Sequence, residues 1–388
     1  MSLQPFAPAS AVIPQYLDQL PADEQGLTGA AGVTVLQAAI ANRNSARCTI
    51  PVIGDSVTEG QGATAFTSRW IAQANRAARA AYPTTANGSS GGQGFIPIAG
   101  TGESTFTWPV TTFSGSTGGG QPIGPVRSAL SVSSAGSWTW TAPAGTTSCR
   151  IMYYANGGGD QFSYQVAAGG PVTVTDSSNT GDGTLTASIT IAGGQVLTVA
   201  WVSGTVYMEG IIHYAGDESS GITFHGCGHY GWNAGTGASG WTQAGYGPGF
   251  PWYPAIAALA TAAYGIMLGI NDASTGNGNY TAAQFQANLE ALVAYLQQST
   301  ALAALPLLLI IPYQPSETFT SGSWAPYAAA IRSVSAAVPA SRVIDLNYRL
   351  PTVASGFDGG ALYYDQYHPT NLGHALIGEI AAASARIA

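Results

Sequence analysis

The sequence predicts an α/β domain with a parallel β-sheet, into which an all-β domain is inserted. Three observations support this fold class. The apolar run at residues 50–53 is followed by a sharp turn and a helical pattern, as in a strand-turn-helix unit. Strand-like and helix-like segments alternate again from residue 221 onward, which is typical of a parallel sheet covered by helices. Between them, residues 101–215 form short alternating runs separated by turn residues, which favours an antiparallel sandwich.

Composition sets the limits for size and partners. The chain has 388 residues, which suits two domains better than one. Hydrophobic residues make up 46%, enough for a sizeable core, whereas charged residues make up only 8%, against roughly 25% in ordinary soluble domains. The formal net charge is −8 and all 11 basic residues are scattered arginines. A chain without a basic stripe is not expected to bind nucleic acid.

The N-terminal region, residues 1–32, is rich in Pro, Gly and Ala and lacks a sustained period, so we expect an arm or linker. It shows no basic segment before an apolar stretch, and therefore no visible signal peptide. No apolar run reaches the ~18 residues of a membrane-spanning helix. The low charge and the abundant small residues favour an extracellular or virion-associated protein, with a cytoplasmic location left open.

The predicted elements divide the chain into segments. Helical spacing appears at residues 33–40, and a helix is predicted at 68–81 after the first strand. Further strands are predicted at residues 221–225, 263–268, 306–311 and 343–346, and further helices at 281–298, at 325–338 and from 371 onward. We therefore predict one α/β domain in two parts, 33–100 and 216–388, with the β-sandwich inserted at 101–215.

Three polar segments follow predicted strands or lie near the C-terminus. The first is Gly54-Asp55-Ser56-Val57-Thr58-Glu59-Gly60, whose turn leaves Ser56 at the carboxyl edge of the sheet, where open α/β proteins bind ligands. The others are Leu268-Gly269-Ile270-Asn271-Asp272 and Asp365-Gln366-Tyr367-His368-Pro369. A serine becomes a nucleophile when a base takes its proton, and Asp-x-x-His lets both side chains leave one loop to provide an oriented base.

Together with Gly231, these segments resemble the sequence blocks of the SGNH/GDSL hydrolase superfamily. The resemblance covers residues 33–100 and 216–388. It implies a flavodoxin-like three-layer α/β/α fold, beside the inserted jelly-roll or sandwich domain. It also implies a serine esterase that acts through an acyl-enzyme, with Ser56 as nucleophile, His368 as base and Asp365 as its partner.

The same resemblance implies an oxyanion hole built from three donors. These are the backbone N–H of Ser56, the backbone N–H of a glycine in the second block and the side chain of Asn271. The second block reads Gly226-Cys227-Gly228-His229-Tyr230-Gly231, where family members have Asn-x-x-x-x-Gly, so its first Asn is replaced by glycine. The spacing assigns the donor to Gly231, with Gly228 as the alternative.

Other polar residues have competing interpretations. Asp345 and Asp358 are alternatives to Asp365 as the carboxylate that orients His368, but each lacks an adjacent histidine. We expect Asp55 to be a structural residue that bonds turn amides or later block residues, and Asp272 to be a scaffold or pocket residue. His229 lies within the second block and is a candidate for the wall of an acyl pocket. The tryptophans near this block either wall the site or pack in the core: Trp232, Trp241 and Trp252.

The inserted sandwich suggests the substrate. Its aromatic residues either stack on sugar rings from an exposed position or fill the sandwich core: Trp138, Trp140, Tyr153 and Trp201. On the first interpretation we predict a carbohydrate esterase that hydrolyses acetyl esters of a glycan or of a small acylated molecule. Two alternatives stay open: an acyltransferase that uses the same acyl-serine, and a phage-tail or glycan-binding protein. No metal or organic cofactor is expected, because the serine mechanism is complete without one.

Overall fold

The computed structural model describes residues 30–84, 90–100, 105–115, 117–177, 180–236, 239–242, 251–353 and 360–386. Most of the predicted N-terminal arm lies outside these residues. Its last three residues, 30–32, begin helix α3 (Ala30–Ala41), which therefore starts earlier than the spacing predicts. The alternative carboxylate Asp358 also lies outside the described residues.

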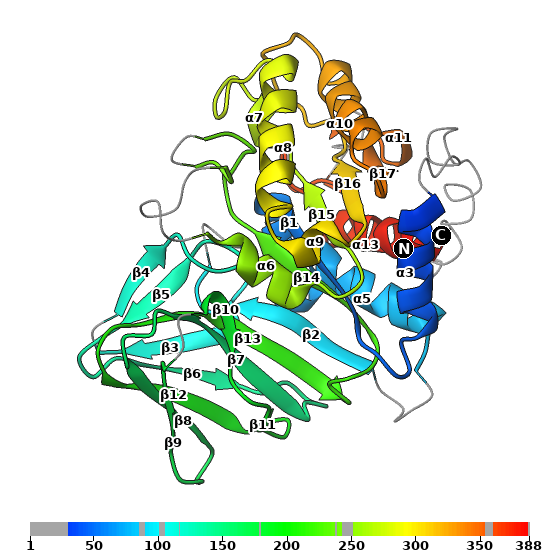
Figure 1. The fold of residues 1–388 in the computed structure, drawn as a ribbon. Coiled ribbons are helices and arrows are strands. Elements are labelled where there is room, and N and C mark those ends of the chain that lie inside the picture. Colours follow the sequence, from blue (N-terminus) through cyan, green and yellow to red (C-terminus); the bar gives the residue numbers. More distant parts are fainter. Residues whose placement is uncertain are drawn as a thin grey trace, which may run out of the picture.

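A five-stranded parallel sheet forms the centre of the α/β part (Figure 1). Its order is β14 (Ile222–Gly228), β1 (Cys48–Gly54), β15 (Tyr264–Met267), β16 (Leu307–Ile311) and β17 (Ser341–Asp345). Every neighbouring pair is parallel, and every residue of the five strands is buried. Numbered along the chain, the order is 2-1-3-4-5, as in flavodoxin-like folds. The prediction of an α/β fold with a parallel sheet is confirmed.

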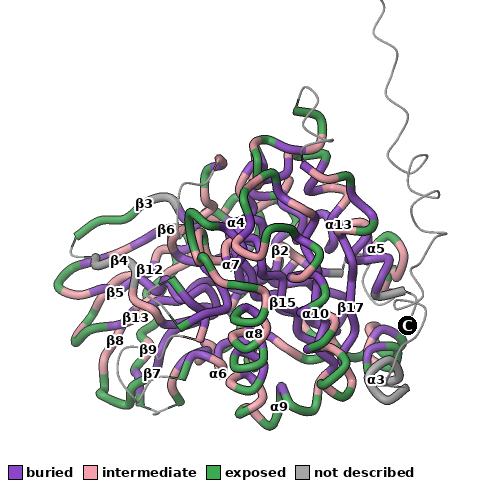
Figure 2. Tube along the Cα trace, turned by 90° about the horizontal axis from the view of Figure 1, so that it is seen from above, coloured by how far each residue is buried: buried purple, intermediate pink, exposed green. Residues whose placement is uncertain are grey.

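Helices cover both faces of this sheet. Helix α5 (Trp70–Ala81) packs against α13 (Asn371–Arg386), and α8 (Ala282–Leu296) packs against α10 (Ala325–Ala337). Figure 2 shows strands β15 and β17 between these two helix pairs. The side chains of Thr281 and Gln284 form a capping box that starts α8. Among the described residues, no helix has the length and apolar character needed to cross a membrane.

Two antiparallel sheets occupy the stretch that was predicted to be all-β. One has the order β10 (Gly181–Leu185), β7 (Ser148–Ala155), β13 (Val206–Gly216), β5 (Ala129–Val132) and β4 (Thr117–Gln121), with β11 (Ile189–Thr190) beside β7 and β2 (Ser90–Pro97) beside β13. The other has the order β3 (Val110–Ser114), β6 (Ser137–Thr141), β12 (Val196–Ser203), β8 (Gln161–Val166) and β9 (Val172–Thr175).

Strand β2 connects the two parts of the molecule. It pairs with β13 of the antiparallel sheet, although it precedes residue 101, where the inserted domain was predicted to begin. Its other side meets β14 of the parallel sheet, where the backbone N–H of Phe95 donates to Nδ1 of His225 at 2.9 Å. Phe95 is fully buried within the same core as the parallel sheet. The antiparallel part is therefore packed directly against the α/β part.

The aromatic residues of the antiparallel sheets fill a core. Trp138 and Trp140 have no exposed surface, and Tyr153 is 6% exposed. In β6 the tryptophans alternate with Ser and Thr, so both indoles point to the inner face of the sheet. Trp201 is half-buried, and its indole N–H donates to the carbonyl of Gly204. The interpretation that Trp138, Trp140 and Tyr153 are exposed for sugar stacking is therefore wrong.

Candidate active site

The turn after β1 places Ser56 at the start of a short helix, α4 (Ser56–Glu59). Asp55 caps this helix, because its Oδ1 accepts a hydrogen bond from the backbone N–H of Val57 at 2.9 Å. Gly60 ends the helix in the left-handed conformation, with φ of +112°, which glycine adopts without steric cost. The strand therefore stops at a defined point, and Ser56 sits at the carboxyl edge of the sheet.

Gly228 allows this turn to pack against the neighbouring strand. Gly54 of β1 lies beside Gly228 of β14. A Cβ atom on Gly228 would lie 2.1 Å from the backbone nitrogen of Glu59, too close for any side chain. The Gly-x-Gly sequence at the end of β14 thus has a packing reason, which accounts for Gly228 without an oxyanion role.

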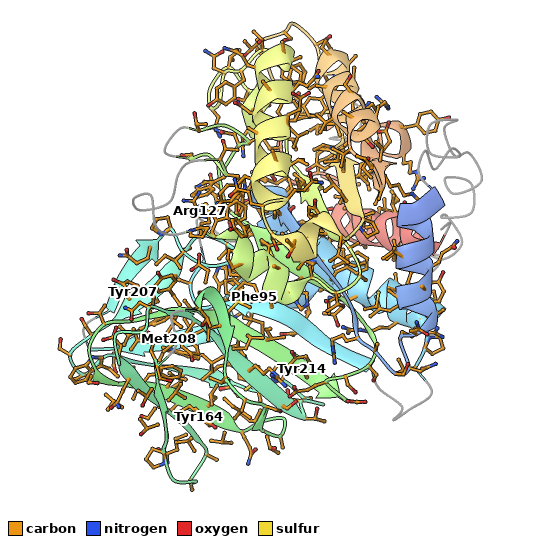
Figure 3. The ribbon with its side chains drawn as sticks, viewed as in Figure 1. Phe95, Arg127, Tyr164, Tyr207, Met208 and Tyr214 are labelled. Carbon is orange, nitrogen blue, oxygen red and sulfur yellow. The ribbon has the colours of Figure 1, made fainter. Side chains whose placement is uncertain are left out.

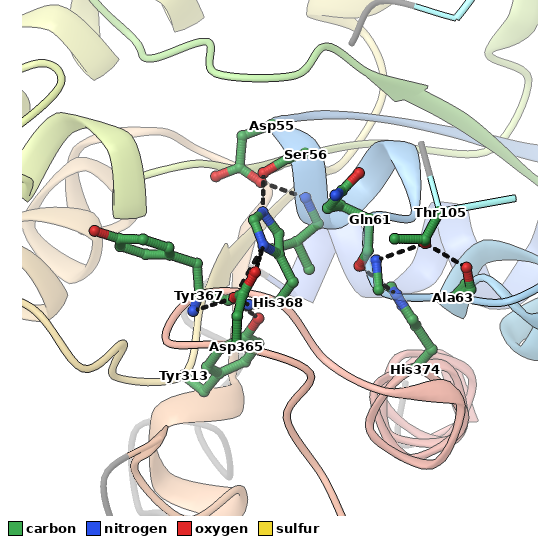
Figure 4. Close-up of polar contacts among 12 residues, drawn as sticks. Asp55, Ser56, Gln61, Ala63, Thr105, Tyr313, Asp365, Tyr367, His368 and His374 are labelled. Atoms are coloured by element: carbon green, nitrogen blue, oxygen red, sulfur yellow. Dashed lines mark hydrogen bonds and ion pairs between the residues drawn. The ribbon is translucent and has the colours of Figure 1, made fainter. Parts of the chain in front are cut away.

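His368 lies directly beside Ser56 (Figure 4). The Oγ atom of Ser56 is 2.9 Å from Nε2 of His368, although 312 positions separate them in the sequence. On the other side of the imidazole, Nδ1 is 2.8 Å from Oδ2 and 3.0 Å from Oδ1 of Asp365. The structure thus brings Ser56, His368 and Asp365 into one hydrogen-bonded chain. In this order, His368 can accept a proton from Ser56 while Asp365 holds the other ring nitrogen.

The Asp365 carboxylate also organises its own loop. Its Oδ1 atom accepts hydrogen bonds from the backbone N–H groups of Tyr367, at 2.7 Å, and His368, at 2.8 Å. Burial acts to raise the pKa of Asp365, but the hydrogen bonds from His368 and from these N–H groups, with the charge of His368, hold it below its ordinary value. The carboxylate is therefore ionised at neutral pH and can stabilise an imidazolium.

The alternative carboxylate Asp345 is engaged elsewhere. It forms an ion pair with Arg332 and caps helix α11 (Leu346–Arg349) by accepting from the backbone N–H of Tyr348 at 2.9 Å. Within the described residues, Asp365 is the carboxylate that contacts His368. The choice of Asp365 over Asp345 therefore agrees with the contacts.

The two other oxyanion candidates, Gly231 and Asn271, lie on adjoining loops. Gly231 follows β14 and has a φ of +72°, and Asn271 belongs to the single turn α7 (Ile270–Ala273) after β15. Nδ2 of Asn271 donates to the carbonyl of Trp232 at 2.9 Å, and Nδ2 of Asn277 donates to that of Gly231 at 3.2 Å. An amide nitrogen carries two N–H bonds, so Asn271 can hold Trp232 and also donate to an oxyanion.

This loop is tied to the serine turn as well. The backbone N–H of His229 donates to the carbonyl of Gly54 at 3.0 Å, and the indole N–H of Trp241 donates to the same oxygen at 3.2 Å. Gly54 lies two residues before Ser56. The segment 229–232, which we call the oxyanion loop after the donor predicted at Gly231, is therefore bound to the carboxyl ends of both β1 and β15. The three nearby tryptophans pack in the core, as one of the two interpretations expected: Trp232, Trp241 and Trp252.

Asp55 and Asp272 are both buried beneath this edge of the sheet. Oδ1 of Asp272 accepts from the backbone N–H of Ala234 at 2.8 Å. Burial raises the pKa of Asp55 to about 6, and burial together with the negative charge of Asp55 raises the pKa of Asp272 to about 7. Both carboxyl groups bind backbone amides of the turns, which agrees with a scaffold role.

Contacts from the inserted segment were not predicted. The hydroxyl of Thr105 accepts from the backbone N–H of Gly62 at 3.0 Å and donates to the carbonyl of Ala63, just after α4 (Figure 4). Val126 contacts His229 of the oxyanion loop, and Arg127 contacts Trp232. No local pattern marks these residues, because their partners lie about forty to one hundred positions away.

Part of the chain matches the model of a known protein family. Residues 224–376 match the model of the GDSL-like lipase/acylhydrolase family. The match begins after the Ser56 turn and includes Gly231, Asn271, Asp365 and His368. The match covers the second part of the α/β domain, and the parallel sheet with its 2-1-3-4-5 order agrees with it, so over these residues the chain is similar to GDSL-like lipases and acylhydrolases, a class of ester hydrolases.

Solved structures extend the comparison to the whole chain. A peptidoglycan O-acetylesterase superposes with a TM-score of 0.68 at 16% identity, over 94% of this chain and 99% of that chain. A two-domain esterase active on acetylated mannans gives a TM-score of 0.41 at 10% identity, over 94% of this chain and 56% of that one. A carbohydrate esterase family 2 enzyme of Corynascus thermopiles (Myceliophthora fergusii) gives 0.32 at 15% identity, over 70% and 99%. No sequence among the curated proteins matches the chain.

Proposed function

We propose that this chain is a serine esterase that removes acetyl groups from a carbohydrate, with Ser56, His368 and Asp365 as its catalytic residues. The observation that carries the proposal is the hydrogen-bonded chain itself. Oγ of Ser56 lies 2.9 Å from Nε2 of His368, and Nδ1 of His368 lies 2.8 Å from Oδ2 of Asp365. These distances are within the hydrogen-bond reach that a nucleophile and its general base need before reaction.

The reaction follows from this arrangement. His368 takes the proton of Ser56 while Oγ attacks the ester carbonyl carbon, and the ionised Asp365 stabilises the imidazolium. The tetrahedral oxyanion accepts hydrogen bonds from the backbone N–H groups of Ser56 and Gly231 and from Nδ2 of Asn271. His368 then donates its proton to the departing alcohol, which leaves an acyl-serine. Water, activated by His368 in the same way, releases the carboxylic acid and restores Ser56.

The choice of an acetylated glycan rests on the fold match. The structure with a TM-score of 0.68 is that of a peptidoglycan O-acetylesterase, and it spans the antiparallel sheets as well as the parallel sheet. The buried aromatic residues of the sandwich give no support to sugar stacking there. We infer the substrate class from the whole-chain likeness alone, and propose that the chain acts on a polymer outside the cytoplasm.

A panel of esters tests the proposal. We expect hydrolysis of p-nitrophenyl acetate to exceed that of the butyrate, and the octanoate to be the poorest substrate. Purified O-acetylated peptidoglycan, acetylated xylan and acetylated mannan should then release acetate, measured by an enzyme-coupled assay. Preference for the octanoate would contradict the acetyl assignment. If the acetyl group is transferred to an added alcohol faster than it is transferred to water, the chain is an acyltransferase. If the folded protein cleaves no ester, the proposal fails.

Replacing Asn271 by alanine should lower kcat by about 10²- to 10³-fold, because one oxyanion donor contributes about 2.7–4 kcal/mol to the transition state. The substrate's ground state gains little from this donor, so KM should change far less than kcat. Initial rates on p-nitrophenyl acetate give both constants.

Asn156→Ala is the matched control for this variant. Asn156 is exposed in a turn of the antiparallel part, where its Nδ2 donates to Asp160. Its kcat should stay within about twofold of wild type, as expected of a surface change away from the site. Equal kcat for Asn271→Ala and wild type, with both proteins folded, would remove Asn271 from the oxyanion hole.

A further inference from the structure

A buried arginine of the inserted segment contacts the oxyanion loop. Arg127 lies between β4 and β5 and is 1% exposed. Figure 3 shows it where the antiparallel sheets meet the α/β part. Its backbone has a φ of +50°, a conformation that residues other than glycine adopt infrequently. A buried charged residue with an unfavourable backbone conformation is stable only where contacts with the surrounding structure offset the cost.

The guanidinium group contacts the loop and its support. Its carbon lies 5.0 Å from the centroid of the Trp232 ring, within the range of a cation–π interaction. Its Nη1 atom lies 3.4 Å from the carbonyl oxygen of Trp241 and 3.5 Å from that of Gly240. Burial lowers the pKa of Arg127 to about 10, opposed by the charge of Asp182, so the group stays cationic at neutral pH.

The preceding residue holds the same loop. Nδ1 of His229 lies 2.6 Å from the carbonyl oxygen of Val126, so this ring nitrogen carries a proton and donates. The imidazole is stacked on Trp232, with ring centroids 3.9 Å apart and planes 29° apart. Burial lowers the pKa of His229 to about 4, so the ring is neutral at neutral pH. Val126 and Arg127 therefore contact the loop at two aromatic rings that are stacked on each other, those of His229 and Trp232.

The same loop is bound to the proposed oxyanion donors. The carbonyl of Trp232 accepts from Asn271, and Gly231 immediately precedes Trp232. The two proposed oxyanion donors are thus coupled through the residue on which Arg127 and His229 pack. A displacement of this ring would move the Gly231 N–H and the Asn271 amide together, and small errors in donor position cost much of the transition-state stabilisation.

We propose that Arg127, with the carbonyl of Val126, is a positioning residue that orients the oxyanion loop, so that the inserted β-domain completes the esterase site. The inference rests on the proposed function, since it needs Gly231 and Asn271 as oxyanion donors. On this proposal the inserted segment positions the oxyanion loop, which is a role different from sugar binding. Arg127 itself touches no reacting atom.

Arg127→Met removes the cation and retains an unbranched apolar side chain. We expect kcat on p-nitrophenyl acetate to fall about 10- to 100-fold, with KM within about twofold of wild type. Amide hydrogen exchange, followed by mass spectrometry without substrate, should become about tenfold faster in peptides that cover residues 228–236.

Arg79→Met is the matched control. Arg79 is a half-buried arginine where α5 meets both parts of the molecule, since its Nε donates to the carbonyl of Ile222 at 3.2 Å and its Nη2 to that of Gly92 at 2.7 Å. Burial and the charge of Arg47 lower its pKa to about 10, as for Arg127. It has no recorded contact with the oxyanion loop among the described residues, so kcat and exchange at 228–236 should stay within about twofold of wild type.

His229→Phe gives a second reading if Arg127→Met does not fold. It keeps a ring on Trp232 but removes the donor to Val126, and it should lower kcat by about tenfold at unchanged KM. The proposal is overturned if folded Arg127→Met and His229→Phe keep wild-type kcat and exchange, or if Arg79→Met shows the same losses. A wild-type protein without esterase activity would refute the proposed function instead, and the exchange comparison would still test whether Arg127 holds the loop.

Discussion

Ser56→Ala is expected to lower kcat for p-nitrophenyl acetate by about 10⁴- to 10⁶-fold. The variant removes the only atom that forms the acyl-enzyme, so what remains comes from substrate binding and the oxyanion donors. Substrate binding should persist, because the proposed donors on Gly231 and Asn271 are untouched. Steady-state rates, corrected for spontaneous hydrolysis, measure the loss.

Ser45→Ala is the control for this substitution. Ser45 is exposed and its Oγ donates to the carbonyl of Asn42, so its kcat should equal that of wild type. A sulfonyl fluoride gives an independent reading, because it should label Ser56 in wild type, by the mass of the Ser56 peptide, and leave Ser56→Ala unlabelled. A folded Ser56→Ala protein with full activity would refute the serine mechanism.

Asp365→Asn should lower kcat by about 10⁴-fold, although it changes one atom of the side chain. Oδ1 of Asp365 accepts from two backbone N–H groups, at 2.7 and 2.8 Å, so the oxygen of an asparagine will occupy that position. The NH₂ group must then face Nδ1 of His368, where Oδ2 now lies at 2.8 Å. A donor there forces the proton of His368 onto Nε2, and this tautomer cannot accept the proton of Ser56.

Asp217→Asn tests whether such a change acts only at this site. Asp217 is half-buried, and its Oδ1 likewise accepts from a backbone N–H, that of Ser219 at 2.8 Å. The control should keep its kcat, and circular dichroism should show both variants folded. We expect the two variants to have similar melting temperatures, whereas kcat should fall only in Asp365→Asn. Wild-type turnover by Asp365→Asn would exclude Asp365 as the partner of His368.

Much of the site could be predicted because the chemistry is local to each segment. Gly-Asp-Ser after an apolar run predicts a strand that stops sharply, and Asp55 indeed caps α4 at that point. Asp-x-x-His predicts two side chains from one loop, and the loop holds Asp365 and His368 in contact. Parallel strands end at the same edge of their sheet, so separate segments could be expected to meet there.

The burial of aromatic residues could not be predicted in the same way. The alternation in β6 shows that Trp138 and Trp140 share one face, but not which face is covered. The second sheet decides this, because it packs over the indoles and leaves Ser137, Thr139 and Thr141 outside. Hydrophobic burial across two sheets depends on how the strands pair, which is a property of the whole chain.

Local patterns were enough to predict the five parallel strands, the longer helices that cover them and the residues of the candidate site, since each depends on residues close to one another. The end of β14 at Gly228, three residues beyond the predicted strand, was not predicted. Nor could the sequence show that β2 pairs with β13 and packs on β14, or that Val126 and Arg127 reach the oxyanion loop. Contacts between segments a hundred residues apart arise from packing two folded layers together. Packing free energy depends on the shape of both surfaces, which no local pattern encodes.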